Sequence, residues 1–182
     1  MLEQVQAAGA TQLSLEVLTR NTPAIRLYRR LGLTITRDLQ LFEWTADDVV
    51  GGPRRAVAGE PAEVAVPPRD LLQHFAATHA VAAAWQRDLP ALLVRPELQG
   101  LSYTNDQGRR SYVLYSVRDG TARIEDLGAT HVEDAIRILL DLQARYHKVV
   151  SVNEPADSPI SAAYIACDFR EADRQHEMVL QI

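Results

Sequence analysis

The residue types that most often bind metals or act as nucleophiles are few in this chain, and they are not spaced for either task. The single cysteine, Cys167, falls on an apolar helix face, which favours an inert buried thiol over a reactive one. The histidines show no metal-ligand spacing with cysteine or carboxylates; they are His74, His79, His131, His147 and His176. The sequence therefore predicts no metal site.

Two further groups of side chains are better explained by structure than by chemistry. Lys and Arg number 19 against 24 Asp and Glu, so the formal net charge is −5, and we expect neither nucleic acid nor an anionic membrane as partner. Three tyrosines of a predicted meander therefore read as sheet packing rather than base stacking: Tyr103, Tyr112 and Tyr115. Four arginines there read as a solvated face: Arg109, Arg110, Arg118 and Arg123.

The chain carries no sign of export or membrane insertion. Its start, MLEQVQAAGA, lacks the basic segment and apolar core of a signal peptide. No run approaches the roughly 20 apolar residues that span a bilayer. One cysteine excludes an internal disulfide and fits a reducing compartment. We expect a cytoplasmic protein.

The first clear positioning element is a short helix in NTPAIRLYRRLGL, residues 21–33. Asn21 or Thr22 can cap its first turn, Pro23 is tolerated there, and Gly32 supplies a left-handed stop. Its apolar residues recur at helical spacing and predict one packed stripe: Ala24, Leu27, Tyr28 and Leu31.

The same pattern recurs 136 residues later. Asn21-Thr22-Pro23 becomes Asp157-Ser158-Pro159. The stripe becomes Ile160, Ala163, Tyr164 and Cys167. A chance match of two ordinary helices remains an alternative, but both halves share the order helix, strand, helix, two strands, which favours a true repeat.

The composition divides the chain into three parts. Residues 1–44 hold a helix end over 2–8, a strand over 13–18, the first repeat helix and two short strands over 34–44. Residues 45–69 are rich in Gly, Pro and Ala and predict a linker. The third part is residues 70–182.

Residues 70–182 predict a second, more complete unit. A helix starts at Asp70, with Gln73 as its capping partner, and runs towards Pro90. A three-stranded meander follows over 98–128. The remaining predicted elements are a helix over 131–146 capped by Thr130 and Glu133, a strand over 149–152, a helix over 157–167 and two strands over 169–182.

LSLEVLTRNTPAIRLYRRLGL resembles the C-terminal motif of the GNAT superfamily of acyl-CoA-dependent N-acetyltransferases, with Asn21, Ala24, Leu27, Tyr28 and Gly32 in place. The resemblance implies an α+β fold: a mixed, largely antiparallel twisted sheet with helices on both faces. It implies that the fragment 1–44 ends a first domain and that 70–182 is a second, diverged one. The parent would be a tandem two-domain acetyltransferase.

Acetyl-CoA is the cosubstrate that the resemblance implies, but the second unit lacks the family's glycine-rich diphosphate loop. LGATHVEDAIRILL runs directly from strand to helix. The predicted capping pair of Thr130 and Glu133 would occupy the helix start, and Glu133 and Asp134 would repel a diphosphate there. We therefore expect this chain alone to bind acetyl-CoA weakly or not at all.

The resemblance also implies site residues. Tyr28 and Tyr164 match the tyrosine that protonates the departing thiolate, and packing of the ring on the sheet is the alternative. Glu125 is the candidate general base, with a surface strand acid as the alternative. Asn21 and Asp157 are candidates for the pantetheine arm, and each is also explained as a helix cap.

Two functions remain open at this point. The parent protein is expected to transfer acetyl groups from acetyl-CoA to an unidentified amine. This chain alone is expected to be catalytically inert and to shape an active site or mediate dimerisation. Because residues 1–44 are too short to bury their own apolar face, we expect them to pack on 70–182 or on a second copy, with a homodimer favoured.

Overall fold

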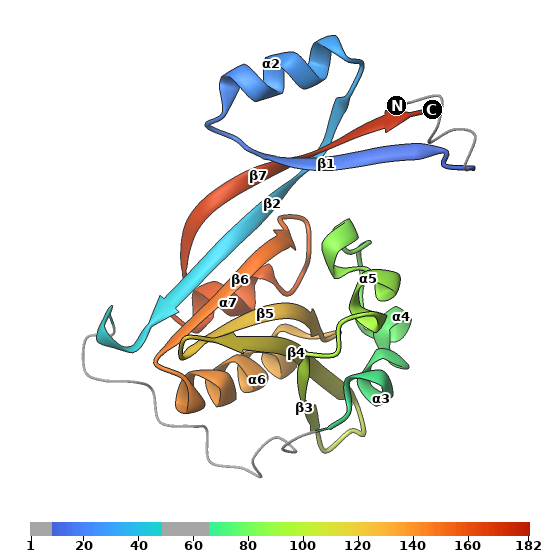
Figure 1. The fold of residues 1–182 in the computed structure, drawn as a ribbon. Helices are drawn as coiled ribbons and strands as arrows, with labels where there is room; N and C mark the ends of the chain where they lie inside the picture. Colours follow the sequence, from blue (N-terminus) through green and yellow to red (C-terminus); the bar gives the residue numbers. More distant parts are fainter. Residues whose placement is uncertain (1–8, 49–65) are drawn as a thin grey trace.

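The computed structural model describes residues 9–48 and 66–182, which form one seven-stranded sheet flanked by helices (Figure 1). The predicted helix over 2–8 and the centre of the predicted linker, 49–65, lie outside these residues. The first part contains β1 (Gln12–Leu18), α2 (Thr22–Arg30), β2 (Thr34–Thr45) and the 3-10 helix η1 (Ala46–Asp48). The second contains α3 (Pro68–Leu72), α4 (Phe75–Thr78), η2 (Trp85–Arg87), α5 (Leu89–Leu93), β3 (Gln99–Thr104), β4 (Arg110–Arg118), β5 (Thr121–Gly128), α6 (Val132–Arg145), β6 (Lys148–Pro155), α7 (Ser161–Ala166) and β7 (Arg170–Gln181).

The strand order is β1-β7-β2-β6-β5-β4-β3. β5 and β6 run parallel because α6 crosses between them, and the other neighbouring pairs in this sheet are antiparallel. The predicted mixed, largely antiparallel sheet is confirmed. The parallel pairing of β5 with β6 runs from Thr121 opposite Lys148 to Ile124 opposite Ser151.

The long strands β2 and β7 are exchanged between two halves of the sheet. β7 lies between β1 and β2, and β2 lies between β7 and β6. Each unit of strand, helix and strand thus inserts its last strand into the other unit, within one chain. The prediction of two short strands in each region is wrong, because each region forms one continuous strand paired on both sides. Register irregularities, such as the one between Leu41 and Phe42, let β2 bend without breaking.

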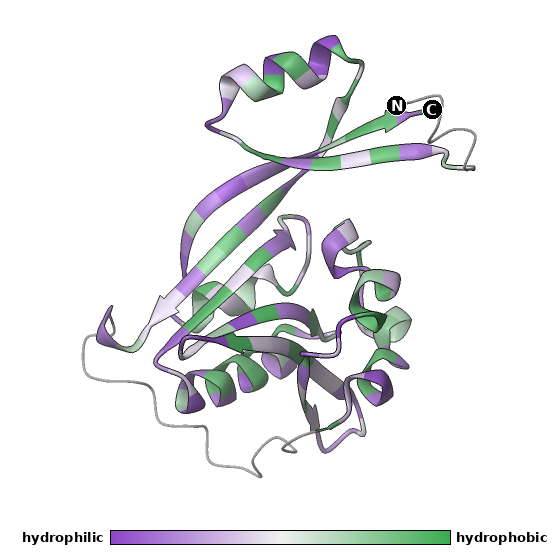
Figure 2. Cartoon of the chain, viewed as in Figure 1, coloured by the Kyte–Doolittle hydropathy of each residue, from purple (hydrophilic) through white to green (hydrophobic). Residues whose placement is uncertain are grey.

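Helices cover both faces of the sheet, and alternate residues of β4 reach two different cores. Val113 and Tyr115 join the core that contains α6 and α7, whereas Tyr112 and Leu114 join the core that contains α3 and α5. The middle of β7 is hydrophilic (Figure 2). A smaller apolar cluster lies under α2 and contains the buried residues Val17, Ile25, Leu33 and Met178.

The ends of α2 and α7 are built from the same backbone hydrogen bonds. The N–H of Leu33 donates to the carbonyl of Tyr28 at 3.0 Å, and the N–H of Phe169 donates to the carbonyl of Tyr164 at 3.0 Å. Gly32 and Asp168 follow the two helices with φ values of 92° and 61°, both in the left-handed region. The predicted repeat therefore extends to backbone conformation, with aspartate standing where glycine is more easily accommodated.

The apolar stripe is buried on α7 but partly exposed on α2. Its α7 members are all buried: Ile160, Ala163, Tyr164 and Cys167. On α2, Leu27 is 46% exposed and Leu31 is 59% exposed, while Ile25 is buried. The predicted packing of Leu27 and Leu31 is therefore wrong. Among the described residues no helix lies beside α2 as α6 lies beside α7 (Figure 1).

The helix predicted from Asp70 towards Pro90 is also wrong. The helix α3 begins at Pro68, so Asp70 lies in its first turn and is not a cap. α4 has only 4 residues, and extended backbone separates it from η2. His79 and Arg87 form ion pairs with buried carboxylates, and these tertiary contacts outweigh the helix propensity of the alanine-rich stretch.

Two predicted helix caps are not formed. The N-cap of α7 is Ile160, so the predicted helix start at Asp157 is wrong, and the intervening residues form a turn. The N-cap of α6 is His131, without a side-chain capping hydrogen bond. The predicted pairing of Thr130 with Glu133 is therefore wrong, and the Thr130 hydroxyl lies 2.9 Å from Nδ1 of His131 instead.

Candidate functional site

Strands β5 and β6 separate at their carboxyl ends. They pair only as far as Ile124 and Ser151, although β5 continues to Gly128 and β6 to Pro155. The register of β5 with β4 shifts at this point, which makes Glu125 the extra residue of a β-bulge. A bulge bends its strand, and this one lies where β5 leaves β6. We call the gap between the two strands beyond Ile124 and Ser151 the splay.

The side chain of Arg87 lies in the splay and links its two sides. Its Nε donates to the backbone carbonyl of Glu125 at 3.1 Å, and its Nη1 donates to Oε2 of Glu154 at 2.7 Å. The side chains of Arg87 and Glu154 are only 5% and 3% exposed. Burial alone would lower the pKa of Arg87, but the charges of Glu154 and Asp126 raise it above its ordinary value. The buried guanidinium of Arg87 therefore bridges β5 and β6 where their backbone hydrogen bonds have ended.

Both ring nitrogens of His79 face oxygen atoms, and the Thr78 hydroxyl lies 3.3 Å from Nδ1. Nε2 lies 2.9 Å from Oδ1 of Asp126, and Nδ1 lies 2.8 Å from the carbonyl oxygen of Phe75. The hydroxyl of Tyr112 donates to the other oxygen of Asp126 at 2.8 Å. Burial alone would lower the pKa of His79, but the hydrogen bond and charge of Asp126 raise it above its ordinary value. An imidazolium, which donates from both nitrogens, satisfies both partners.

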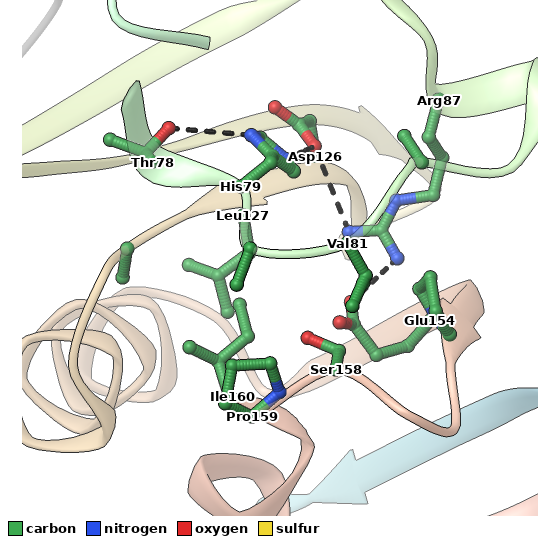
Figure 3. Close-up of a pocket in the computed structure, with 14 residues that line it drawn as sticks. Thr78, His79, Val81, Arg87, Asp126, Leu127, Glu154, Ser158, Pro159 and Ile160 are labelled. Carbon is green, nitrogen blue, oxygen red and sulfur yellow. Dashed lines mark hydrogen bonds and ion pairs between the residues drawn. The ribbon is translucent and has the colours of Figure 1, made fainter. Parts of the chain in front are cut away.

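Residues 79–87 form a strap that leads from the end of α4 through η2 and roofs a small pocket at the splay (Figure 3). The guanidinium of Arg37, on β2, donates to the carbonyls of Ala82 and Ala83, the latter at 3.0 Å. The other walls are the end of β5 and the turn between β6 and α7. The polar and charged lining residues are Thr78, His79, Arg87, Asp126, Glu154 and Ser158.

Glu125, the predicted general base, is held by cations away from this pocket. Arg95 donates to its two carboxylate oxygens at 2.7 and 3.0 Å, and Ser116 donates to one of them at 2.8 Å. Burial alone would raise the pKa of Glu125, but these hydrogen bonds and the charge of Arg123 lower it. Because a carboxylate of low pKa is a weak proton acceptor, this geometry gives no support to the predicted base role.

Tyr164 is fully buried next to the splay. Its hydroxyl lies 3.0 Å from Oγ of Ser151 and donates to Oε2 of Glu154 at 3.4 Å. Its ring stacks on Phe42 with the centroids 4.5 Å apart. Burial and the charge of Glu154 raise the pKa of Tyr164. The ring of Tyr164 therefore packs on another aromatic ring, while its hydroxyl is polarised by the Glu154 carboxylate. Arg87 connects that carboxylate to the splay.

Of the other predicted site residues, Tyr28 and Asn21 lie away from the splay. Tyr28 is half-buried on α2, in the small apolar cluster under that helix. Asn21 caps α2 as predicted, since its Oδ1 accepts from the N–H of Ala24 at 3.3 Å. Asp157 is exposed on the turn between β6 and α7. Glu125 and Tyr164 therefore flank one gap, whereas Tyr28 and Asn21 belong to α2 and its N-cap, and α2 lies apart from β5 (Figure 1).

The start of α6 carries acidic residues and no glycine loop. Glu133 and Asp134 lie in its first turn, and the connecting residues 129–131 contain no glycine. The carboxylate of Asp134 accepts from Arg109 at 3.2 Å and from Asn105 at 3.0 Å. The predicted negative charge at the start of α6 is therefore present, but the charge of Asp134 is compensated by Arg109.

The whole chain is similar to solved acetyltransferase structures. A GCN5-related N-acetyltransferase from Kribbella flavida aligns with a TM-score of 0.66 and 16% identity, covering 98% of this chain and 71% of that one. One from Sphaerobacter thermophilus aligns with a TM-score of 0.63 and 16% identity, covering 99% of this chain and 65% of that one. The protein has the GNAT fold.

A tandem GNAT protein from the clavulanic acid biosynthesis pathway is similar to the same degree. It aligns with a TM-score of 0.64 and 14% identity, covering 98% of this chain and 66% of that one. The chain thus spans 65% to 71% of the length of these three GNAT structures. No family model and no curated protein matches the sequence. At these identities the likeness concerns the GNAT fold alone.

The splay in this conformation does not fit the extended arm of an acyl-CoA. Arg87 already takes the carbonyl of Glu125, a backbone group that faces this gap, and bridges the gap to Glu154. In the described part of the chain no three His, Cys, Asp or Glu side chains come together as metal ligands. The candidate site is a closed polar cluster under a strap.

Sequence reasoning missed most of this cluster. It assigned His79 and Arg87 to a regular helix and gave no role to Asp126. Arg87 lies 67 residues from Glu154, and His79 lies 47 residues from Asp126. The adjacent acids in IEDL, which lie between the apolar Ile124 and Leu127, were the available signal, because a buried carboxylate needs a partner.

Proposed function

We propose that this chain is the C-terminal part of a tandem acyl-CoA-dependent N-acyltransferase that transfers an acetyl group from acetyl-CoA to an amine. The observation that carries the proposal is the repeated helix end of α2 and α7 within a GNAT fold. The exposed Leu27 and Leu31 support it, because they stand where α7 packs on α6. In this proposal β1, α2 and β2 end a first domain.

The same proposal assigns catalysis to the first domain and a supporting role to residues 70–182. Arg87 closes the splay of that second unit, and residues 129–131 contain no glycine. Tyr28 and Asn21 would then be the functional members of the repeat, as proton donor and as contact to the cosubstrate. Tyr164 and Asp157 would keep structural roles.

A second candidate is a non-catalytic dimerisation module. The observation that favours it is the outer edge of β1, an edge strand of the described sheet, next to the exposed Leu27 and Leu31. Two copies could cover both surfaces at once by symmetric association. Sedimentation at micromolar concentration tests this, and a strictly monomeric chain would contradict it.

Calorimetric titration with acetyl-CoA tests the main proposal. Each lost charge-assisted diphosphate contact costs roughly 1.5–3 kcal/mol, so this chain should bind at millimolar concentration or not at all. A form extended at its amino terminus should bind at micromolar concentration and release free thiol from acetyl-CoA with an amine acceptor. In that form Tyr28→Phe should lower turnover far more than Tyr164→Phe. Micromolar binding by the present chain, or equal effects of the two substitutions, would contradict the assignment.

A further inference from the structure

The cluster at the splay is electrically balanced only when His79 carries a proton. Arg87 contributes one positive charge, and Asp126 and Glu154 contribute two negative charges. Protonated His79 supplies the fourth charge and makes the sum zero. The other three charged members of this cluster have side chains no more than 5% exposed. Loss of that proton would leave a net negative charge in a region with little water to screen it.

The hydrogen bonds of His79 independently favour its protonated, imidazolium form. A neutral imidazole has one N–H and one lone pair. If Nδ1 keeps the proton, the lone pair of Nε2 faces the Asp126 carboxylate at 2.9 Å. If Nε2 keeps it, the lone pair of Nδ1 faces the Phe75 carbonyl at 2.8 Å, and among the described residues the only donor near it is the Thr78 hydroxyl at 3.3 Å. In either tautomer one of the two contacts becomes repulsive and must lengthen.

We propose that the strap, residues 79–87, is a pH-sensitive cover of the splay pocket, and that loss of the His79 proton detaches its α4 end from Asp126. Arg87 remains tied to Glu154, and Arg37 remains on the carbonyls of Ala82 and Ala83. The strap then opens from one side. The opened pocket presents Asp126 to solvent. This inference goes beyond acyl transfer and does not depend on it.

The direction of the effect follows from the groups that face His79. Asp126 on β5 favours the imidazolium, as does the Phe75 carbonyl on α4, whereas Arg87 and burial oppose it. Tyr112 on β4 is neutral and donates to Asp126. Because the folded-state pKa of His79 is raised, the closed strap has its full stability below the ordinary histidine value. It loses that stability as the pH rises through the raised pKa.

Thiol labelling of a Val81→Cys variant measures the opening. Val81 lies in the end of the strap that detaches, between His79 and the carbonyls held by Arg37, and is half-buried over the pocket, while the native Cys167 is buried in the main core and reports global unfolding in the same molecule. The labelling rate at position 81, divided by that of an unstructured peptide thiol, follows the open fraction. We expect it to rise between pH 5.5 and 8.5, by about tenfold for each unit by which the pKa of His79 is raised. Labelling of Cys167 should not rise with it.

Two matched histidine substitutions complete the test. Val81→Cys/His79→Gln should label rapidly at every pH, whereas Val81→Cys/His147→Gln should keep the pH dependence, because His147 is 63% exposed and pairs with Asp47 away from the strap. In the unsubstituted chain, the ring of His79 should titrate by NMR above its ordinary pKa. An open fraction that does not change with pH, a pH dependence that survives His79→Gln, or titration of His79 below its ordinary pKa would each overturn the proposal.

Discussion

Nη1 of Arg87 lies 2.7 Å from Oε2 of Glu154, across a gap in which two parallel strands no longer hydrogen-bond to each other. Arg87 comes from η2, above the sheet, and Glu154 comes from the end of β6. The ion pair therefore joins the strap to the strand that leads into α7. Both side chains are almost completely buried, so each charge has lost its hydration and is compensated mainly by the charge of its partner.

Arg87→Ala should destabilise the chain strongly. Removing one member of a buried ion pair leaves the other charge without a partner, which typically costs about 3–5 kcal/mol. Urea unfolding measures the loss. Arg118→Ala is the matched control, because Arg118 is 94% exposed and lies 3.8 Å from Asp119, and it should change the stability by less than about 1 kcal/mol. Similar effects of the two substitutions would mean that Glu154 is hydrated or repartnered.

The two repeat helices should respond differently to truncation of an apolar residue of the stripe. Ile160 is buried beside α7, and Ile160→Ala should cost about 2–4 kcal/mol through lost burial and the cavity left behind. Leu27 is 46% exposed on α2, and Leu27→Ala should cost less than about 1 kcal/mol in this chain. Thermal unfolding of both variants checks this. A large loss for Leu27→Ala would show that another surface covers α2 in solution.

Gly32→Ala tests the left-handed end of α2. Its φ of 92° disfavours any residue with a Cβ, and an added Cβ would lie 3.2 Å from Cδ1 of Leu180. We expect a loss of about 1–2 kcal/mol in the free energy of unfolding. Gly32→Asn should lose less, because asparagine tolerates this conformation better and Asp168 already adopts it after α7. Equal stability of wild type and Gly32→Ala would contradict the assigned backbone.

Local signals in the sequence predicted the regular elements that depend on them. Asn21 caps α2, and Gly32 ends it, because cap and stop residues act on the adjacent backbone. The turn at Asp119-Gly120 joins β4 to β5, and α6 follows its apolar spacing. The parallel pairing of β5 with β6 followed from the crossover helix between them.

The strap and the exchanged strands depend on contacts that local patterns do not encode. An alanine-rich stretch around His79 favours helix, and only distant carboxylates, Asp126 and Glu154, draw it into an extended path. The absence of long-range information in local patterns also explains why the apolar stripe of α2 was predicted to be packed but is partly exposed. Helical spacing identifies apolar residues, but it does not say which elements are present to cover Leu27 and Leu31.

The ion pair between Arg95 and Glu125 should make part of the stability depend on pH. The pKa of Glu125 is lowered, although burial alone would raise it, because Arg95, Ser116 and Arg123 favour the carboxylate. A carboxylate of depressed pKa stabilises the fold above its unfolded-state pKa, and this contribution is lost as the pH falls through the folded-state value. Arg95→Ala should therefore cost about 1.5–3 kcal/mol at pH 7. The difference from wild type should shrink below the unfolded-state pKa of Glu125.

Urea unfolding of wild type and Arg95→Ala between pH 3 and pH 7 measures this difference. Arg95 also donates to Glu97 at 2.7 Å, so Glu97→Gln is the variant that separates the two partners. Glu97 is 52% exposed by its side chain and should contribute little, because an exposed carboxylate is compensated by water. If the cost of Arg95→Ala is the same at pH 3 as at pH 7, its role is packing of the arginine stem rather than stabilisation of the Glu125 carboxylate.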